Sequence, residues 1–202
     1  MKTKKEILVL DKLLIISTFL LFGLFRADLV IMVVYILILP YVYLTNRKSE
    51  LMFLFLASAL SVLWALLARD QYGYNTDFIS FYGYNIFPLF AWAAGLFAMR
   101  VLFNNISNYF PKDSEYRKFA KFSFIYFFLL VTAEYLAYHH LNIQNISTSQ
   151  YQGLPFCDCL HAPRWMQFSY FAMGPVFFIL STLVVKYKNT LIAGFDRYRP
   201  RF

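Results

Sequence analysis

The sequence predicts an all-α integral membrane protein: a polytopic helical bundle of about six transmembrane helices, forming a single membrane domain over residues 1–202. The first observation is composition, because 60% of the residues are hydrophobic and 15% are charged, whereas soluble domains carry about 25% charged residues. One soluble core of this size could not bury so much apolar surface. The second observation is spacing, since the apolar residues form long stretches separated by charged segments. A helix needs about 20 such residues to cross a bilayer.

Six apolar stretches are candidates for these helices, and the first two are short. The predicted spans cover residues 11–25, 29–44, 51–68, 86–103, 119–138 and 165–186. Lysines precede the first stretch, as they do in a signal peptide, but no small-residue cleavage site follows it. We therefore expect an uncleaved helical hairpin, either as two tight spans or as a re-entrant pair, and the charge distribution favours two spans.

The lysine and arginine residues predict which side of the membrane each segment faces. Cytoplasmic loops retain such residues, and placing the N-terminus inside leaves just three of the 19 cations on the opposite side, namely Arg26, Arg69 and Arg164. Both termini are therefore expected in the cytoplasm, with the chain in an inner or plasma membrane. The net charge of +8 does not indicate a nucleic-acid partner, because the cations lie between the apolar stretches. The expected partner is the lipid bilayer.

Two long loops, residues 69–85 and 139–164, are predicted to face outward. They are rich in Tyr, Asn, Asp and Gly and nearly free of lysine, which is more typical of ordered surface loops than of flexible linkers. A tyrosine suits the headgroup layer of a membrane because its ring can be buried while its hydroxyl stays hydrated. The tyrosines expected there are Tyr72, Tyr74, Tyr82, Tyr84, Tyr138 and Tyr151.

Glu134 is the most informative single residue of the sequence. It follows an apolar run and precedes the expected membrane exit near Tyr138. An acid inside the hydrocarbon boundary is costly and is usually kept for a pairing or a protonic role. Glu134 is therefore predicted to act as a general acid or base that faces the outer side. The alternative is a helix-end carboxylate paired with Arg69 or Arg164.

Three further residues complete the predicted catalytic group. Asp70 borders the first outward loop, and side-by-side packing of the helical hairpins would bring it near Glu134 as a pair of carboxylates. An ion pair between Asp70 and the adjacent Arg69 is an equally consistent interpretation. His139 and His140 directly follow the apolar run that carries Glu134, where an imidazole can take part in acid–base chemistry.

The segment CDCLH contains both cysteines of the chain, and three interpretations of it remain open. The first is a metal site for zinc or copper formed by Cys157, Cys159 and His161, with His139 or His140 as a further ligand. The C-x-C-x-H spacing is tighter than that of typical zinc sites. The second is a disulfide in an oxidising compartment, although a separation of two residues strains such a bond. The third is two ordinary cysteines packed in an interfacial loop.

The motifs of several large enzyme classes are absent from the sequence. There is no P-loop, no G-x-G-x-x-G, no H-E-x-x-H and no G-x-S-x-G. Their absence argues against nucleotide-driven pumping, dinucleotide redox chemistry, zinc proteolysis and serine hydrolysis of those types. No cofactor-binding residues are predicted beyond the metal site.

Three functions are compatible with these features. The first is an enzyme that acts on a lipid or isoprenoid polyene by acid–base chemistry, with aromatic faces that stabilise a carbocation. The alternative is a non-catalytic subunit or assembly factor of a larger membrane complex, for which small residues along 57–65 and 91–98 supply a packing face toward membrane-protein partners. A small secondary transporter is the third, and the helix break at Gly174-Pro175 is more typical of a kink than of a transport site.

Overall fold

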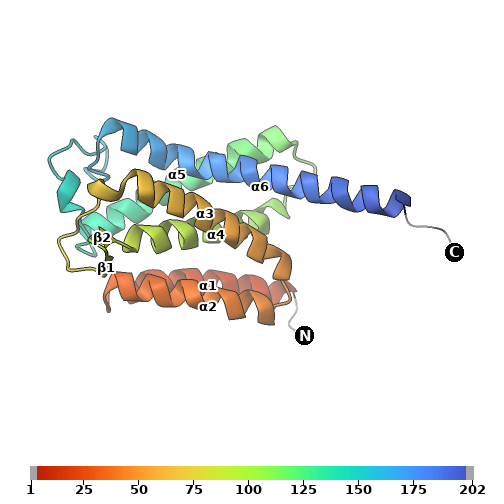
Figure 1. The fold of residues 1–202 in the computed structure, drawn as a ribbon, viewed down its shortest axis with the longest axis horizontal. Coiled ribbons are helices and arrows are strands. Elements are labelled where there is room, and N and C mark those ends of the chain that lie inside the picture. Colours follow the sequence, from red (N-terminus) through yellow and green to blue (C-terminus); the bar gives the residue numbers. More distant parts are fainter. Residues whose placement is uncertain (1–3, 199–202) are drawn as a thin grey trace.

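Figure 1 shows the helices side by side in an elongated bundle, in a computed structural model that describes the backbone of residues 4–198 and the side chains of residues 6–187. The helices are α1 (Lys4–Phe22), α2 (Ala27–Leu44), α3 (Leu51–Leu67), α4 (Phe87–Ser107), α5 (Glu115–His139) and α6 (Arg164–Tyr198). Short 3-10 turns at Lys48–Glu50, Arg69–Gln71 and Ile146–Thr148 and one hairpin of β1 (Ser80–Phe81) and β2 (Tyr84–Asn85) complete the regular structure of the described residues. The predicted all-helical fold is confirmed.

Local signals in the sequence explain where the helices begin. α5 begins at Glu115 instead of the predicted residue 119, because the Ser114 hydroxyl caps the helix by accepting a hydrogen bond from the Arg117 backbone N–H (3.4 Å). Pro88 lies in the first turn of α4, where a helix does not need the N–H that proline lacks. The caps therefore set bounds that hydropathy alone leaves uncertain by several residues.

Five of the helices are long and apolar enough to cross a membrane: α2, α3 together with the turn before it, α4, α5, and α6 as far as Tyr187. Between 17% and 44% of the residues in these spans are buried inside the molecule, so most of their apolar surface faces outward, as in helices surrounded by lipid. α1 is outside this set because Glu6, Asp11 and Lys12 lie in its first half. Five of the six predicted spans are thereby supported, and the span over residues 11–25 stays a prediction.

α3 and α4 form the most extensive helix pair of the bundle, while α2 packs on α4 and α5 packs on α6. Small residues allow the close approach of α3 and α4, since Ala57, Ser61, Ala93 and Ala94 are all buried. From the sequence, these small residues could serve either to dock a partner protein or to pack within the bundle. In the structure the buried ones pack within the bundle.

The connections between helices gather at two ends of the bundle (Figure 1). The loop end holds the turn between α1 and α2 and the two long loops, residues 68–86 and 140–163. The basic end holds the turn between α2 and α3 and the turn between α4 and α5, together with most of the described lysine and arginine residues.

The two long loops are joined into one cap over the loop end. The Asn75 backbone N–H donates to the Gln144 carbonyl oxygen (3.0 Å). Asn145 bridges the loops with its side chain, which accepts a hydrogen bond from the Gly73 N–H (3.1 Å) and donates one to the Gln71 carbonyl oxygen (2.7 Å). The loops therefore form mutually bonded lids, not separate linkers.

At the basic end, a buried ion pair ties α1 to the end of α2. Asp11 is 4% exposed and accepts two hydrogen bonds from the Arg47 guanidinium (2.8 and 3.0 Å) and one from the Tyr41 hydroxyl (2.8 Å). A bidentate contact between arginine and carboxylate is among the strongest side-chain hydrogen bonds. Glu50 and Arg100 form a second pair (3.0 Å) between the start of α3 and the middle of α4.

Candidate functional site

Four aromatic side chains meet at the loop end, and we name them the Tyr72 cluster. The Tyr72 hydroxyl accepts hydrogen bonds from the indole N–H groups of Trp64 (2.6 Å) and Trp92 (3.4 Å) and lies 2.9 Å from the Tyr170 hydroxyl. The Tyr72 and Tyr170 hydroxyls share a hydrogen bond in which either can be the donor. The cluster thus joins α3, the following loop, α4 and α6.

Burial raises the pKa of two tyrosines in the first long loop, Tyr72 and Tyr74. It raises the pKa of Tyr72 to about 12; the hydrogen bonds with the rest of the cluster lower that pKa in part, and the negative charge of Glu134 raises it. Burial also raises the pKa of Tyr74, with contributions from the charges of Tyr72 and Glu134. Both hydroxyls are therefore protonated at neutral pH.

Glu134 lies in the part of α5 that is near the loop end. Its negative charge raises the pKa of Tyr72 and of Tyr74. Among the described residues, no group forms a hydrogen bond or an ion pair with this carboxylate. Glu134 is thus an acid that is placed among aromatic side chains without a partner for its charge.

The other shielded acids of the described chain all have cationic partners. The pairs are Asp11–Arg47, Asp28–Arg26, Glu50–Arg100 and Asp113–Lys121. Asp28 is fully buried and also accepts a hydrogen bond from the Ile79 backbone N–H (2.9 Å), which ties α2 to the first long loop. Glu134 on α5 differs from these acids because it has no cationic partner among the described residues.

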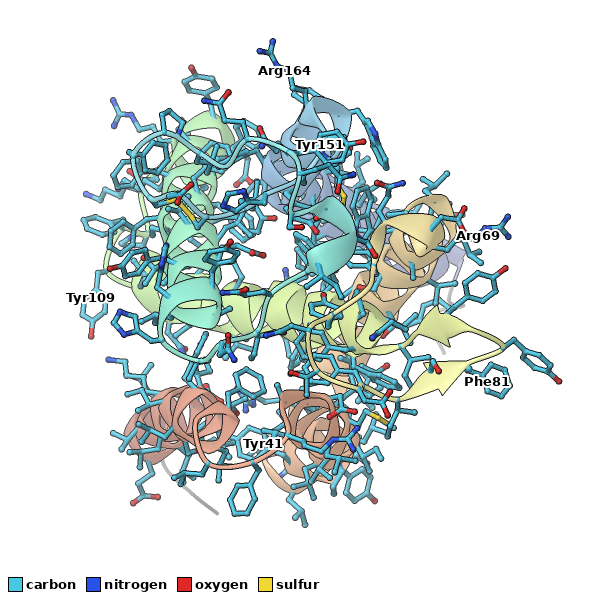
Figure 2. The ribbon with its side chains drawn as sticks, turned by 90° about the vertical axis from the view of Figure 1, so that its left-hand side faces the viewer. Tyr41, Arg69, Phe81, Tyr109, Tyr151 and Arg164 are labelled. Atoms are coloured by element: carbon cyan, nitrogen blue, oxygen red, sulfur yellow. A yellow bond between two sulfur atoms is a disulfide. The ribbon has the colours of Figure 1, made fainter. Side chains whose placement is uncertain are left out.

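The arginines that could have paired with Glu134 point elsewhere. Arg69 lies 3.5 Å from Asp70, whose side chain is 74% exposed, so the partner of Asp70 in the structure is Arg69. Figure 2, which looks onto the loop end, shows Arg69 and Arg164 at the edge of the bundle with their side chains directed away from it. Neither the predicted carboxylate pair with Asp70 nor the alternative ion pair with an arginine is formed among the described residues.

His139 and His140, the other predicted catalytic residues, lie at the end of α5 and are exposed. His139 Nε2 is 2.9 Å from the Cys157 carbonyl oxygen, and both imidazoles contact the Tyr135 ring. These contacts attach the end of α5 to the second long loop. In the described structure the imidazoles therefore face the surface and have no contact with Glu134.

Cys157 and Cys159 are joined by a disulfide, seen as a yellow sulfur–sulfur bond in Figure 2. Of the three interpretations of this segment, namely a metal site, a disulfide and two unbonded cysteines, the structure contains the disulfide. Both ring nitrogens of His161, the third predicted metal ligand, face backbone carbonyl oxygens, those of Tyr151 (2.9 Å) and Asp158 (3.2 Å). The described residues include no group of three or more His, Cys, Asp or Glu that could hold a metal ion. The predicted zinc or copper site is not formed by this oxidised loop.

Gly174 allows α5 and α6 to approach each other beside the Tyr72 cluster. The Tyr126 hydroxyl donates to the Tyr170 carbonyl oxygen (2.6 Å), and a Cβ atom at Gly174 would overlap the Tyr126 ring. The sequence Gly174-Pro175 predicted a kink. The structure adds that the glycine is required for contact between the helices.

The sequence did not predict the Tyr72 cluster. Tyr72 was expected to keep its hydroxyl hydrated, but that hydroxyl is bonded inside the bundle; Tyr82, in contrast, is 85% exposed as a surface tyrosine should be. A signal for the cluster is present in the chain. Trp64 and Trp92 are two of its three tryptophans, both near the loop end of predicted spans, and a buried indole N–H needs an acceptor.

The loop end thus combines one unpartnered carboxyl group with aromatic rings and protonated tyrosine hydroxyls. The Tyr170 ring lies 4.9 Å from Trp92 and 5.5 Å from Trp64, measured between ring centroids. Such an arrangement can give or take a proton next to an apolar molecule. In comparisons with known proteins, no family model, no curated protein and no solved structure matches the chain.

Proposed function

We propose that this is a multi-pass membrane enzyme in which Glu134 exchanges a proton with a lipid or isoprenoid substrate. The observation that carries the proposal is the Glu134 carboxylate, which has no partner among the described residues although the other shielded acids have one. Acids within membrane-spanning segments are rare and are kept for protonic or pairing roles. With pairing absent, a protonic role is the explanation that remains.

The proposed reaction starts with Glu134 in its protonated form. Transfer of the proton to one carbon of a substrate double bond leaves a carbocation on the neighbouring carbon. Aromatic faces attract cations, and the loop end supplies the packed rings of Tyr170, Trp92 and Trp64. Loss of a proton from an adjacent carbon to the carboxylate restores the acid and yields an isomerised or cyclised polyene.

The exposure of α5 supports entry of an apolar substrate from the bilayer. α5 has the lowest buried share of the five candidate spans, 17%. Its outward side chains include Phe124 and Phe128, which are 73% and 65% exposed. A substrate dissolved in lipid would therefore meet α5, the helix that carries Glu134, without crossing water.

Lipid analysis of membranes that contain the wild type or Glu134→Gln tests this proposal. Glutamine keeps the shape of the side chain but has no acidic proton, so the product should fall by about 10²-fold or more, the usual contribution of general acid–base catalysis. Asp70→Asn is the matched control, because it removes an exposed acid from the same end and should leave the product unchanged. Equal product from wild type and Glu134→Gln, at equal amounts of inserted protein, would refute the proposal.

We also propose that the loop end faces outward and both termini lie in the cytoplasm. The support is the distribution of cations, since at the loop end the described lysine and arginine residues are Arg26, Arg69 and Arg164. A membrane-impermeant maleimide applied to intact cells should label Tyr82→Cys at the loop end and spare Lys112→Cys at the basic end, both in a background that lacks the native cysteines. The reverse pattern would invert the proposed orientation.

A non-catalytic subunit or assembly factor is the second candidate, and exposed small residues favour it. Gly95 is exposed on α4, and a Cβ atom there would meet nothing within 4 Å, which leaves room for a neighbouring helix. If the chain is a subunit, purification in mild detergent should recover a stoichiometric protein partner that Gly95→Leu releases. Recovery of the chain without any partner would remove this candidate. The small secondary transporter stays a prediction.

A further inference from the structure

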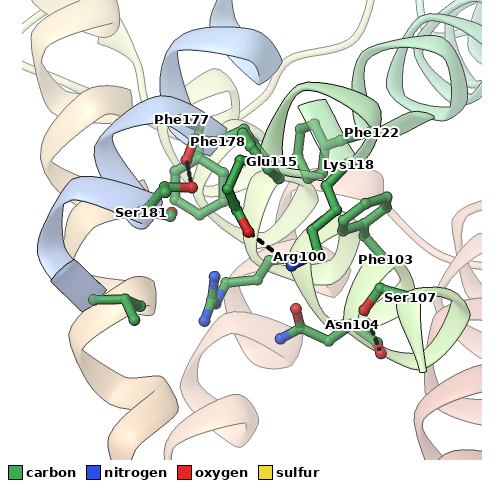
Figure 3. Close-up of a pocket in the computed structure, with 12 residues that line it drawn as sticks. Arg100, Phe103, Asn104, Ser107, Glu115, Lys118, Phe122, Phe177, Phe178 and Ser181 are labelled. Carbon is green, nitrogen blue, oxygen red and sulfur yellow. Dashed lines mark hydrogen bonds and ion pairs between the residues drawn. The ribbon is translucent and has the colours of Figure 1, made fainter. Parts of the chain in front are cut away.

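A cavity of about 270 Å³ lies at the basic end between α4, α5 and α6, at the other end of the bundle from the Tyr72 cluster (Figure 3). We call its polar lining residues the polar wall and its apolar ones the apolar wall. The polar wall includes Arg100, Asn104, Ser181 and the ion pair of Glu115 with Lys118, and the apolar wall includes four phenylalanine rings and Val185. The volume is slightly below the roughly 300–1,000 Å³ of typical small-molecule sites. It suits a head group and the beginning of an attached chain.

The polar wall offers more hydrogen-bond donors than acceptors. Arg100 donates from Nε to Glu50 (3.0 Å), and its two terminal amino groups have no acceptor among the described residues. The Asn104 side-chain amide likewise has no described partner. Lys118 donates to Glu115 (2.7 Å), which leaves further ammonium protons available. A surplus of donors suits a ligand that is anionic and only accepts hydrogen bonds.

Ser181 provides an independent indication of a ligand. Its side chain is 3% exposed and lines the cavity, and its hydroxyl has no hydrogen-bond partner. A buried hydroxyl without a partner is unfavourable, and an acceptor oxygen in the cavity would remove that penalty. The Ser123 hydroxyl is buried and unpartnered too, but it does not line the cavity. Ser123 is therefore a matched control for Ser181.

The apolar wall includes both buried and exposed side chains. Phe122 and Phe177 are buried, and Val185, which lines the cavity as well, is 40% exposed. An apolar chain attached to the anion would follow these side chains to the lipid-facing surface. The two walls together fit an amphipathic ligand.

We propose that this cavity binds a phosphate group at the end of an apolar chain, as in an anionic phospholipid. The planar guanidinium of Arg100 binds phosphate through two parallel hydrogen bonds, and the Asn104 amide and the Ser181 hydroxyl donate to the remaining oxygens. Basic pockets between transmembrane helices recognise phosphorylated head groups in this way. The site is separate from Glu134 and does not depend on the reaction proposed for it.

Native mass spectrometry of the full-length protein in neutral detergent, titrated with phosphatidic acid, tests the proposal. One equivalent should bind, and Arg100→Gln should weaken binding by about 10-fold or more while Ser181→Ala weakens it a few-fold, as expected for charge-assisted and neutral hydrogen bonds. Ser123→Ala and Lys121→Gln should bind like the wild type. Lys121 is a cation of the same end that is paired with Asp113 and does not line the cavity.

Three outcomes would overturn the proposal. The first is the absence of saturable one-to-one binding by the wild type. The second is equal weakening in Arg100→Gln and Lys121→Gln, which would show general surface attraction. The third is equally tight binding of inorganic phosphate, which would remove the role of the apolar wall. If Arg100→Gln fails to fold because Glu50 loses its partner, Asn104→Leu alters the same wall with that ion pair intact and should also weaken phosphatidic acid binding.

Discussion

Two acids at opposite ends of the bundle, Asp11 and Glu134, are held in different ways. At the basic end, Asp11 is enclosed by Arg47 and Tyr41 and fastens α1 to α2. At the loop end, Glu134 lies among tyrosines with no described group to balance its charge. A paired acid can hold helices together, whereas an unpaired acid can exchange its proton, which is the role we propose for Glu134. Each of the following predictions tests one side of this comparison.

The largest expected effect is the loss of the paired acid at the basic end. Asp11→Asn leaves the Arg47 guanidinium without its counter-charge, and breaking a buried ion pair costs about 3–5 kcal/mol; we expect a value near the lower limit because the Arg47 side chain is 23% exposed. The free energy of unfolding in mild detergent measures this loss. Asp70→Asn, in an exposed pair, should change it by less than about 0.5 kcal/mol. Equal losses of unfolding free energy in Asp11→Asn and Asp70→Asn would contradict the expected difference between a buried and an exposed ion pair.

A smaller loss is expected where α5, the helix of Glu134, meets α6. Gly174→Ala places a methyl group against the Tyr126 ring, and overpacking of this kind costs about 1–3 kcal/mol. Gly95→Ala is the matched control, since it also adds a methyl group within a helix but in open space. Thermal unfolding of both variants should show a lowered midpoint for Gly174→Ala alone. A shift of the same size in both variants would contradict the close approach of the two helices.

The Tyr72 cluster should contribute less than the ion pair at the basic end. Tyr72→Phe removes the acceptor of the Trp64 and Trp92 N–H groups, and leaving such donors unsatisfied costs about 1–2 kcal/mol. Tryptophan fluorescence should shift as well, because both indoles lose a contact. Tyr82→Phe alters an 85% exposed ring and should change neither stability nor fluorescence. An unchanged emission spectrum of Tyr72→Phe would contradict the hydrogen bonds to the indoles.

The weakest effect is a dependence of stability on alkaline pH. A tyrosine in the unfolded chain ionises near pH 10, whereas burial raises the pKa of Tyr72 to about 12 in the folded protein. The folded state therefore keeps a proton that the unfolded state releases, so stability is constant below about pH 9 and falls as pH rises from 10 toward 12. Unfolding midpoints across this range should fall less steeply for Tyr72→Phe. Identical slopes would show that Tyr72 is accessible to water.

Local patterns in the sequence predicted the helices, because hydropathy acts over neighbouring residues. The predicted span over residues 51–68 corresponds to α3, and that over residues 119–138 differs from α5 mainly at its capped start. The apolar pattern could not decide whether the span over residues 11–25 crosses a membrane. Asp11 fastens that helix by contact with Arg47, which lies 36 positions further along the chain.

The candidate site was predicted in part. Glu134 stands out in the sequence because an acid interrupts an apolar run, which is a local signal. Tyr170 could not be assigned to its partner Tyr72, because the two residues are 98 positions apart and meet only when α6 packs beside α3. The disulfide of Cys157 could not be chosen over metal binding, because residue type and spacing are compatible with both.

The free energy of unfolding of Glu134→Gln in lipid bicelles tests the central comparison most directly. If no group balances the Glu134 charge, replacing the carboxyl group with a neutral amide removes no stabilising contact. The variant should then unfold within about 0.5 kcal/mol of the wild type or be more stable, because a charge that is partly removed from water without a partner is unfavourable. A loss of about 2 kcal/mol or more, approaching that of Asp11→Asn, would show that Glu134 is a structural ion-pair residue like the acids of the basic end.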